Sequence, residues 1–151
     1  MQSAVSVPVI VIDGPSGSGK GTVARLVAQR LGWHLLDSGA LYRLVAMAGT
    51  WRGRAEDDAA GHAELAARLD TRFKSDADGG ERILLDGRDV TLELRTETAG
   101  AAASRVAAMP AVRAALLARQ RGFAEPPGLV ADGRDMGTVV FTTAPVKVYL
   151  T

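Results

Sequence analysis

The stretch that decides the fold of this chain is Gly14-Pro15-Ser16-Gly17-Ser18-Gly19-Lys20-Gly21-Thr22, which follows the apolar run Val7–Ile12 and Asp13. A strand that leads into a glycine-rich turn, a lysine and an amphipathic helix binds phosphate. Glycines let several N–H groups converge on one anion, and the helix N-terminus points at it. Gly14, Gly19 and Lys20 have the spacing of the phosphate-binding loop (P-loop) pattern. We therefore expect residues 14–22 to bind ATP, in preference to the alternative of a glycine-rich turn without a ligand.

The loop departs from the general pattern at Gly21, where a hydroxyl residue usually follows the lysine. The hydroxyl comes one position later, at Thr22, and we expect it to reach the Mg²⁺ that accompanies ATP. A second candidate for this cofactor is Asp132, which closes the apolar run Leu129–Ala131. Enzymes with this loop place a magnesium-orienting carboxylate at the end of such a strand. An aspartate there can also simply cap the next turn, but the phosphate loop favours the magnesium role.

Composition restricts the functional classes. The chain has 151 residues, 47% of them hydrophobic and 23% charged, which is typical of one globular domain. It has no cysteine, which excludes disulfides and thiolate metal sites. A net charge of +1 gives no general attraction to nucleic acid, and the N-terminal apolar run is too short for a signal peptide or membrane span. We expect a cytoplasmic protein without nucleic-acid or membrane partners, in which His34 is structural and His62 lies on the surface.

Strand-like and helical segments alternate along the chain, which predicts an α/β fold with a parallel sheet flanked by helices. Residues 71–74 and 82–85 are also strand-like, but a turn at 76–80 separates them, and Asp86-Gly87 forms a second turn. We interpret residues 1–151 as a single domain that contains a small antiparallel β insertion in a subdomain at about 66–105. The chain stops where a strand ends, so we expect it to be incomplete at its C-terminus. The expected strands are 7–12, 33–36, 129–131 and 146–150, and the expected helices are 19–31, 40–49, 62–69, 96–109 and 110–123.

A second group of polar residues follows the second strand, at the same predicted sheet edge as the glycine loop. Ser38 and Arg43 are five residues apart, and both could face one pocket from the start of one helix. Asp37 or Ser38 could cap that helix. Arg43 could hold an acceptor phosphate, and Ser38 could bond to a base or sugar. The alternative is a capping serine beside a surface arginine.

Three long segments, Val11–Thr22, Leu36–Arg43 and Ala131–Phe141, resemble the signature segments of bacterial cytidylate kinases. The resemblance runs through the whole chain and includes residues 85–90 and 104–107. It implies a P-loop kinase fold whose β insertion belongs to the monophosphate-binding region. It also implies transfer of the γ-phosphoryl group of Mg·ATP to CMP or dCMP, and a monomer at full length. The family continues into an arginine-rich lid and further acceptor contacts, so we expect residues 1–151 alone to be a weak or inactive kinase.

The resemblance also assigns roles to individual residues. Lys20, Arg43 and Arg134 are the implied catalytic residues, with the two arginines holding the acceptor phosphate. Cytosine offers a ring nitrogen and a carbonyl as acceptors and an amine as donor, which an arginine and a carboxylate can meet. The implied CMP-binding residues are Ser38, Arg43, Ser104, Arg113, Arg134 and Asp135.

Two other functions stay open on the sequence alone. One is a P-loop kinase that phosphorylates a different monophosphate or a hydroxylated metabolite, which a panel of acceptors would distinguish. The other is a nucleotide-binding module without catalysis, which would bind nucleotide but release no ADP in response to an acceptor.

Overall fold

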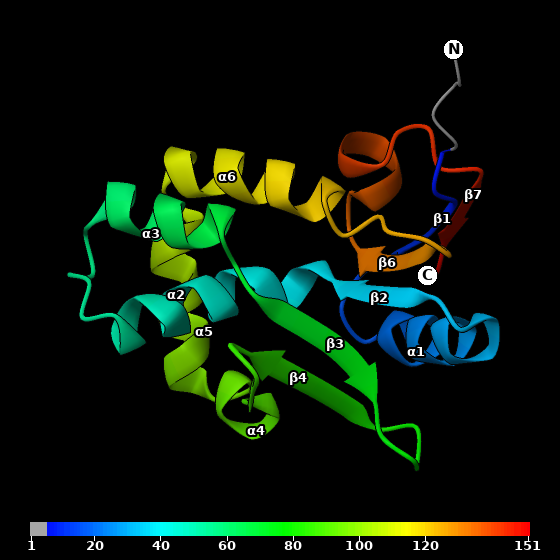
Figure 1. Ribbon diagram of the computed structural model, residues 1–151, viewed down its shortest axis with the longest axis horizontal. Coiled ribbons are helices and arrows are strands. Elements are labelled where there is room, and N and C mark those ends of the chain that lie inside the picture. Colours follow the sequence, from blue (N-terminus) through cyan, green and yellow to red (C-terminus); the bar gives the residue numbers. More distant parts are fainter. Residues whose placement is uncertain (1–5) are drawn as a thin grey trace.

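The computed structural model describes residues 6–151. Its centre is a four-stranded parallel sheet in the order β2-β6-β1-β7 (Figure 1). Every residue of β6 is buried, and all but one of β1, so the apolar runs form the interior strands as predicted. Register pairs Asp132 of β6 with Ile12 of β1 on one side and with Asp37 of β2 on the other. The strands are β1 (Val9–Asp13), β2 (His34–Asp37), β6 (Leu129–Gly133) and β7 (Val146–Tyr149).

Helices α2, α3, α5 and α6 form a cluster beside the sheet, with α3 packed on α6 and α2 on α5 (Figure 1). Thr96 caps α5 by accepting a hydrogen bond from the N–H of Ala99, and Pro110 stands in the first turn of α6. The bounds are α1 (Lys20–Leu31), α2 (Leu41–Trp51), α3 (Ala59–Ala67), α5 (Glu97–Ala107) and α6 (Pro110–Arg121). No single helix among residues 6–151 has the length and apolar character needed to cross a membrane; α5 and α6 meet the test only together, and they are bent by 100°.

Helix α1 ends as predicted at Gly32, whose φ of 68° is left-handed and whose N–H bonds to carbonyls of the last turn. Its buried residues, however, are Ala24 and Ala28. The apolar side chains that recur at helical spacing include Val23, Leu26 and Leu31, and these are 37%, 48% and 46% exposed. Small alanines therefore make the close contact with the sheet, and Val27 packs beside them, while Val23, Leu26 and Leu31 face outward.

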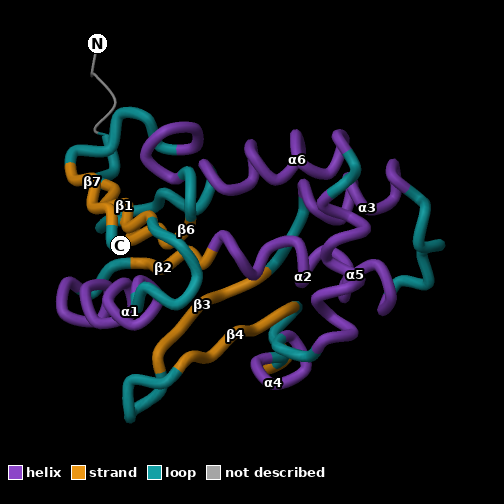
Figure 2. The backbone as a smooth tube through the Cα atoms, turned by 180° about the vertical axis from the view of Figure 1, so that it is seen from behind, coloured by secondary structure: helices purple, strands orange, loops and turns teal. Residues whose placement is uncertain are grey.

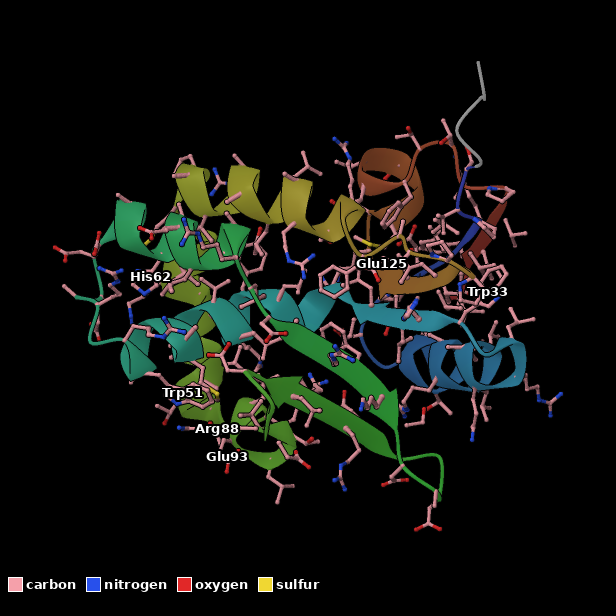
Figure 3. All side chains as sticks on the ribbon, viewed as in Figure 1. Trp33, Trp51, His62, Arg88, Glu93 and Glu125 are labelled. Carbon is pink, nitrogen blue, oxygen red and sulfur yellow. The ribbon has the colours of Figure 1, made fainter. Side chains whose placement is uncertain are left out.

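The predicted antiparallel insertion is confirmed as a three-stranded sheet of β3 (Thr71–Ser75), β4 (Glu81–Leu85) and β5 (Arg88–Asp89), with β3 beside β2 (Figures 1 and 2). Asp76 holds the first turn by accepting hydrogen bonds from the N–H groups of Asp78 and Gly80. A short helix that the sequence did not predict, α4 (Thr91–Leu94), leads from this sheet to α5. The Arg88 guanidinium lies 4.8 Å from the ring centre of Trp51, which joins the insertion to the end of α2 (Figure 3).

Two local expectations were wrong. Residues Ser38–Ala40 form a 3₁₀ turn before α2, and neither Asp37 nor Ser38 caps the helix with its side chain. The Asp37 carboxylate instead pairs with Arg95 at 3.1 Å. His62 is not on the surface: it is 4% exposed, its Nδ1 lies 2.8 Å from the carbonyl of Asp58, and it packs on Gly49 (Figure 3).

Candidate active site

The glycine loop begins at the buried end of β1. A Cβ on Gly14 would lie 2.4 Å from the carbonyl oxygen of Leu150, so no larger residue fits there. Gly17 and Gly19 have φ of 80° and 86°, a conformation that glycine adopts without strain. Gly19 is the N-cap of α1 and offers no side chain to the first N–H groups of that helix. The backbone donors of the loop and helix are thus available to an anion.

Ser18 gives a second indication of a ligand at the loop. Its Oγ is buried and has no hydrogen-bond partner among residues 6–151. A buried hydroxyl without a partner is costly, because it has lost water and gained nothing in return. A phosphate oxygen in the loop would satisfy it.

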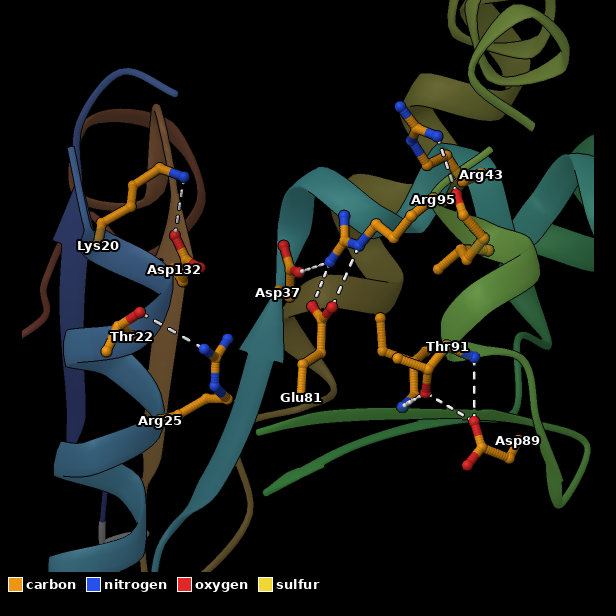
Figure 4. Close-up of polar contacts among 12 residues, drawn as sticks. Lys20, Thr22, Arg25, Asp37, Arg43, Glu81, Asp89, Thr91, Arg95 and Asp132 are labelled. Atoms are coloured by element: carbon orange, nitrogen blue, oxygen red, sulfur yellow. Dashed lines mark hydrogen bonds and ion pairs between the residues drawn. The ribbon is translucent and has the colours of Figure 1, made fainter. Parts of the chain in front are cut away.

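Lys20 and Asp132 form an ion pair of 3.2 Å across the start of α1 and the end of β6 (Figure 4). Asp132 is only 5% exposed. Burial raises the pKa of Asp132 to about 6; the neighbouring Asp37 carboxylate adds to this rise, and Lys20 opposes it. The raised pKa means that this buried carboxylate binds a proton more tightly than a free aspartate does.

The donor set fits a magnesium ion that is carried mainly by nucleotide. Thr22 is exposed, and its Oγ1 accepts a hydrogen bond of 3.5 Å from Arg25 (Figure 4). Residues 6–151 contain no group of three or more histidine, cysteine or acidic side chains that could hold a metal. Mg²⁺ usually binds to one or two carboxylates and completes its shell with substrate phosphates and water. Asp132 and Thr22 are suited to that kind of site.

Arg43 projects from α2 toward the junction between the insertion and α5. Its Nη1 donates to the carbonyls of Leu94 at 2.8 Å and Thr96 at 3.1 Å (Figure 4). The guanidinium also covers Gly100 of α5, where a Cβ would lie 3.1 Å from Nη2. The side chain is therefore held by three positions on one segment of the chain.

Arg134 follows β6 and contacts the glycine loop, because its Nη2 donates to Ser16 Oγ at 2.7 Å. The segment after it is fixed by Asp13 at the end of β1. The buried Asp13 carboxylate accepts hydrogen bonds from the N–H groups of Met136 at 2.8 Å and Gly137 at 2.9 Å. These bonds start a five-residue π-helix, Met136–Val140.

The remaining candidates lie around the start of α2. Burial raises the pKa of Tyr42 above its usual range; the Arg113 charge opposes this rise and the Asp135 charge adds to it, so both charges lie near the phenol. Ser38 packs against Gly133, where a Cβ would clash with its Oγ at 2.3 Å. Ser104 is exposed on α5, one turn after Gly100, whose carbonyl accepts its hydroxyl.

The structure places Ser38 against Gly133 at the end of β6, and Arg113 and Asp135 near Tyr42 of α2. Arg43 contacts the segment before α5, and Arg134 contacts the glycine loop. Ser104 donates to the carbonyl of Gly100, and Gly100 in turn packs against Arg43.

Sequence reasoning missed two groups that shape this site. Asp13 ends an apolar strand, as Asp132 does, so the same sequence signal could have identified it. The cluster of Arg95, Asp37 and Glu81 combines residues from three distant segments. No local pattern in the sequence indicates it.

Comparison with known proteins agrees with this geometry. A family model described as Cytidylate kinase matches residues 10–151. A curated relative named Cytidylate kinase from Pseudomonas aeruginosa (strain LESB58) is 60% identical over 147 residues, which cover 97% of this chain and 64% of the relative. Those from Colwellia psychrerythraea and Pseudomonas syringae pv. tomato are 58% and 61% identical, over 97% of this chain and 65% of each relative. The chain therefore spans somewhat under two thirds of the length of these relatives.

Proposed function

This chain belongs to the cytidylate kinase family, and from that premise we propose that it binds Mg·ATP on the glycine loop and CMP or dCMP beside α2. The reaction is transfer of the γ-phosphoryl group, which gives ADP and CDP or dCDP. The contact between Arg134 and Ser16 carries this proposal. It puts an arginine of the acceptor side on the loop that would hold the donor, and phosphoryl transfer requires two anionic groups at close range.

Each side chain has a limited task in this mechanism. Lys20 and the loop N–H groups hold the outer phosphates of ATP, and Asp132 and Thr22 orient the magnesium, which neutralises charge on the transferred group. Arg43 and Arg134 offset the charge of the acceptor phosphate and aim it at the donor. No general base is required, because a phosphate oxygen is already nucleophilic at neutral pH.

We propose that Ser38, Ser104, Arg113 and Asp135 select cytosine. Arg113 and Asp135 both act on the pKa of Tyr42, so an arginine and an aspartate lie near the same ring. This supports a site in which the arginine binds the ring nitrogen and carbonyl of cytosine and the aspartate binds its amine. Arg113 donates to the carbonyl of Ala107 at 2.8 Å, which holds it at the start of α6. Cytoplasmic localisation and a monomeric full-length protein stay predictions.

The experiment is to mix this chain with Mg·ATP and CMP and to follow the phosphorus species by NMR. Because residues 1–151 alone should be a weak kinase, we expect ADP and CDP to form slowly and in equal amounts, and neither to form without CMP. The Lys20→Ala variant should form neither product. ADP without CDP would indicate hydrolysis. Binding of both nucleotides without either product, even after an incubation long enough to detect slow turnover, would favour a nucleotide-binding module. Product formed with another acceptor, but not with CMP, would support a kinase of different specificity.

A further inference from the structure

Arg95 lies between α4 and α5 and joins the insertion to the central sheet (Figure 4). Its Nη2 donates to Asp37 Oδ2 at the end of β2, at 3.1 Å. Its Nε donates to Glu81 Oε2 of β4 at 3.2 Å, and Nη2 also pairs with the other oxygen of the same carboxylate. One guanidinium therefore binds Glu81 through two bonds and Asp37 through a third.

The backbone on either side of Arg95 is bound to a different arginine. Leu94 and Thr96 both present their carbonyls to Nη1 of Arg43. Thr96 also accepts the N–H of Gly100, which packs against the same guanidinium. Segment 94–96 thus contacts two groups of residues. Its Arg95 side chain binds Asp37 and Glu81, and its main-chain carbonyls bind Arg43.

The energetics of this cluster favour a positioning role over a purely stabilising one. The side chains of Arg95, Asp37 and Glu81 are 44%, 21% and 25% exposed, and ion pairs at that level of exposure contribute little to stability. Bidentate arginine–carboxylate pairs do, however, fix orientation strongly. Only this cluster connects the end of β2, the insertion and the start of α5 through side-chain ion pairs among residues 6–151.

We propose that Arg95 is a positioning residue for the acceptor phosphate: by clamping the insertion to Asp37, it holds the carbonyls of Leu94 and Thr96 where they orient Arg43. This inference rests on the proposed function, in which Arg43 binds the phosphate of CMP. Without the clamp, segment 94–96 can move relative to β2, and Arg43 moves with it. No hydrogen bond or ion pair joins the three clamp residues to residues 14–22, so we expect the glycine loop to keep its geometry in an Arg95 variant.

The test compares Arg95→Ala with Arg82→Ala, and measures CMP and ATP affinity separately by calorimetry. Arg82 is a matched control, because it also lies in the insertion and pairs with an aspartate, Asp89, at 2.9 Å, but within the same small sheet. We expect Arg95→Ala to weaken CMP binding by about tenfold to a hundredfold and to change ATP affinity by less than about twofold. Glu81→Gln should act in the same direction with a smaller loss, and Arg82→Ala should leave both affinities unchanged.

Unchanged CMP affinity in Arg95→Ala, with selective CMP binding by the wild type, would overturn the clamp and leave the proposed function intact. An equal loss of CMP and ATP affinity would also overturn it, because that result describes general destabilisation. If the wild type itself does not bind CMP, the proposed function fails, and hydrogen exchange then decides on the clamp. The clamp predicts faster exchange of the Ala99 and Gly100 amides in Arg95→Ala than in Arg82→Ala, and equal rates would contradict it.

Discussion

The donor side and the acceptor side that we propose for this site are built in opposite ways. The proposed donor side is one continuous stretch, Gly14–Thr22, which is joined to Asp132 by an ion pair. The proposed acceptor side takes residues from α2, α5, α6 and the segment after β6, and one of them, Arg43, contacts the segment that follows the insertion. A phosphate loop works through its own backbone, whereas a base and phosphate pocket works through side chains that tertiary packing brings together. We therefore expect substitutions on the two sides to separate cleanly in their effects.

The largest effect should come from the backbone of the donor side. Gly14→Ala places a methyl group against the Leu150 carbonyl and should destabilise the fold by about 3 kcal/mol. Gly17→Ala is the matched control, because a Cβ there meets nothing within 4 Å and adds only the strain of its φ of 80°. That strain is worth about 1–2 kcal/mol. Equal losses in denaturant unfolding would show that the close approach to Leu150 is not what fixes the loop.

Lys20→Ala should remove a charged partner of the phosphates and weaken ATP binding by about tenfold to a hundredfold. CMP affinity should stay within about twofold of the wild type, because the acceptor residues lie on other elements. Calorimetric titration with each nucleotide measures both quantities. An equal loss of CMP affinity would show that the ATP and CMP sites are not independent, which would contradict this prediction.

Arg113→Ala should show the reverse pattern, with CMP about tenfold weaker and ATP unchanged. Arg68→Ala provides the control, since Arg68 is an exposed arginine at the end of α3. Measured against UMP as well as CMP, the variant should also lose discrimination between bases. If CMP affinity stays at the wild-type value, Arg113 is not a base-reading residue.

The last prediction concerns pH and the Lys20–Asp132 pair, and it is measured on the protein without nucleotide. The pKa of Asp132 is raised to about 6, so the folded protein binds this proton more tightly than the unfolded chain does. The contribution of Asp132 to stability is therefore largest at low pH and declines as pH rises toward and through 6. Thermal unfolding in EDTA should show Asp132→Asn gaining stability relative to wild type between pH 4 and pH 7. A difference that is constant over this range would contradict the raised pKa.

The sequence predicted best where local backbone chemistry decides the structure. The glycines of the loop, the Gly32 helix end and the turn at Asp76 follow from the residues themselves, and the structure confirms them. Asp37 was one of two candidates to cap a helix, and its carboxylate instead bonds to Arg95, which is 58 residues away.

The apolar stripe of α1 and the buried His62 were misleading for a related reason. Which face of a helix is buried, and whether a histidine is covered, depends on neighbours such as Gly49 that only the fold supplies. The roles of Ser104, Arg113, Arg134 and Asp135 came from the resemblance, whereas those of Ser38 and Arg43 also followed from their spacing, and all of these roles stay predictions.

The most direct test of the central claim, that residues 10–151 hold an acceptor site for cytosine, is calorimetric titration with CMP, AMP, GMP and UMP under identical conditions. A polar site that pairs fully with one base can reject another by about 10⁴, so even a partial pocket should favour CMP by about tenfold or more. Selective CMP binding would locate the base-reading residues within this chain. Equal affinity for all four nucleotides, or no binding at all, would contradict the roles proposed for Arg113 and Asp135.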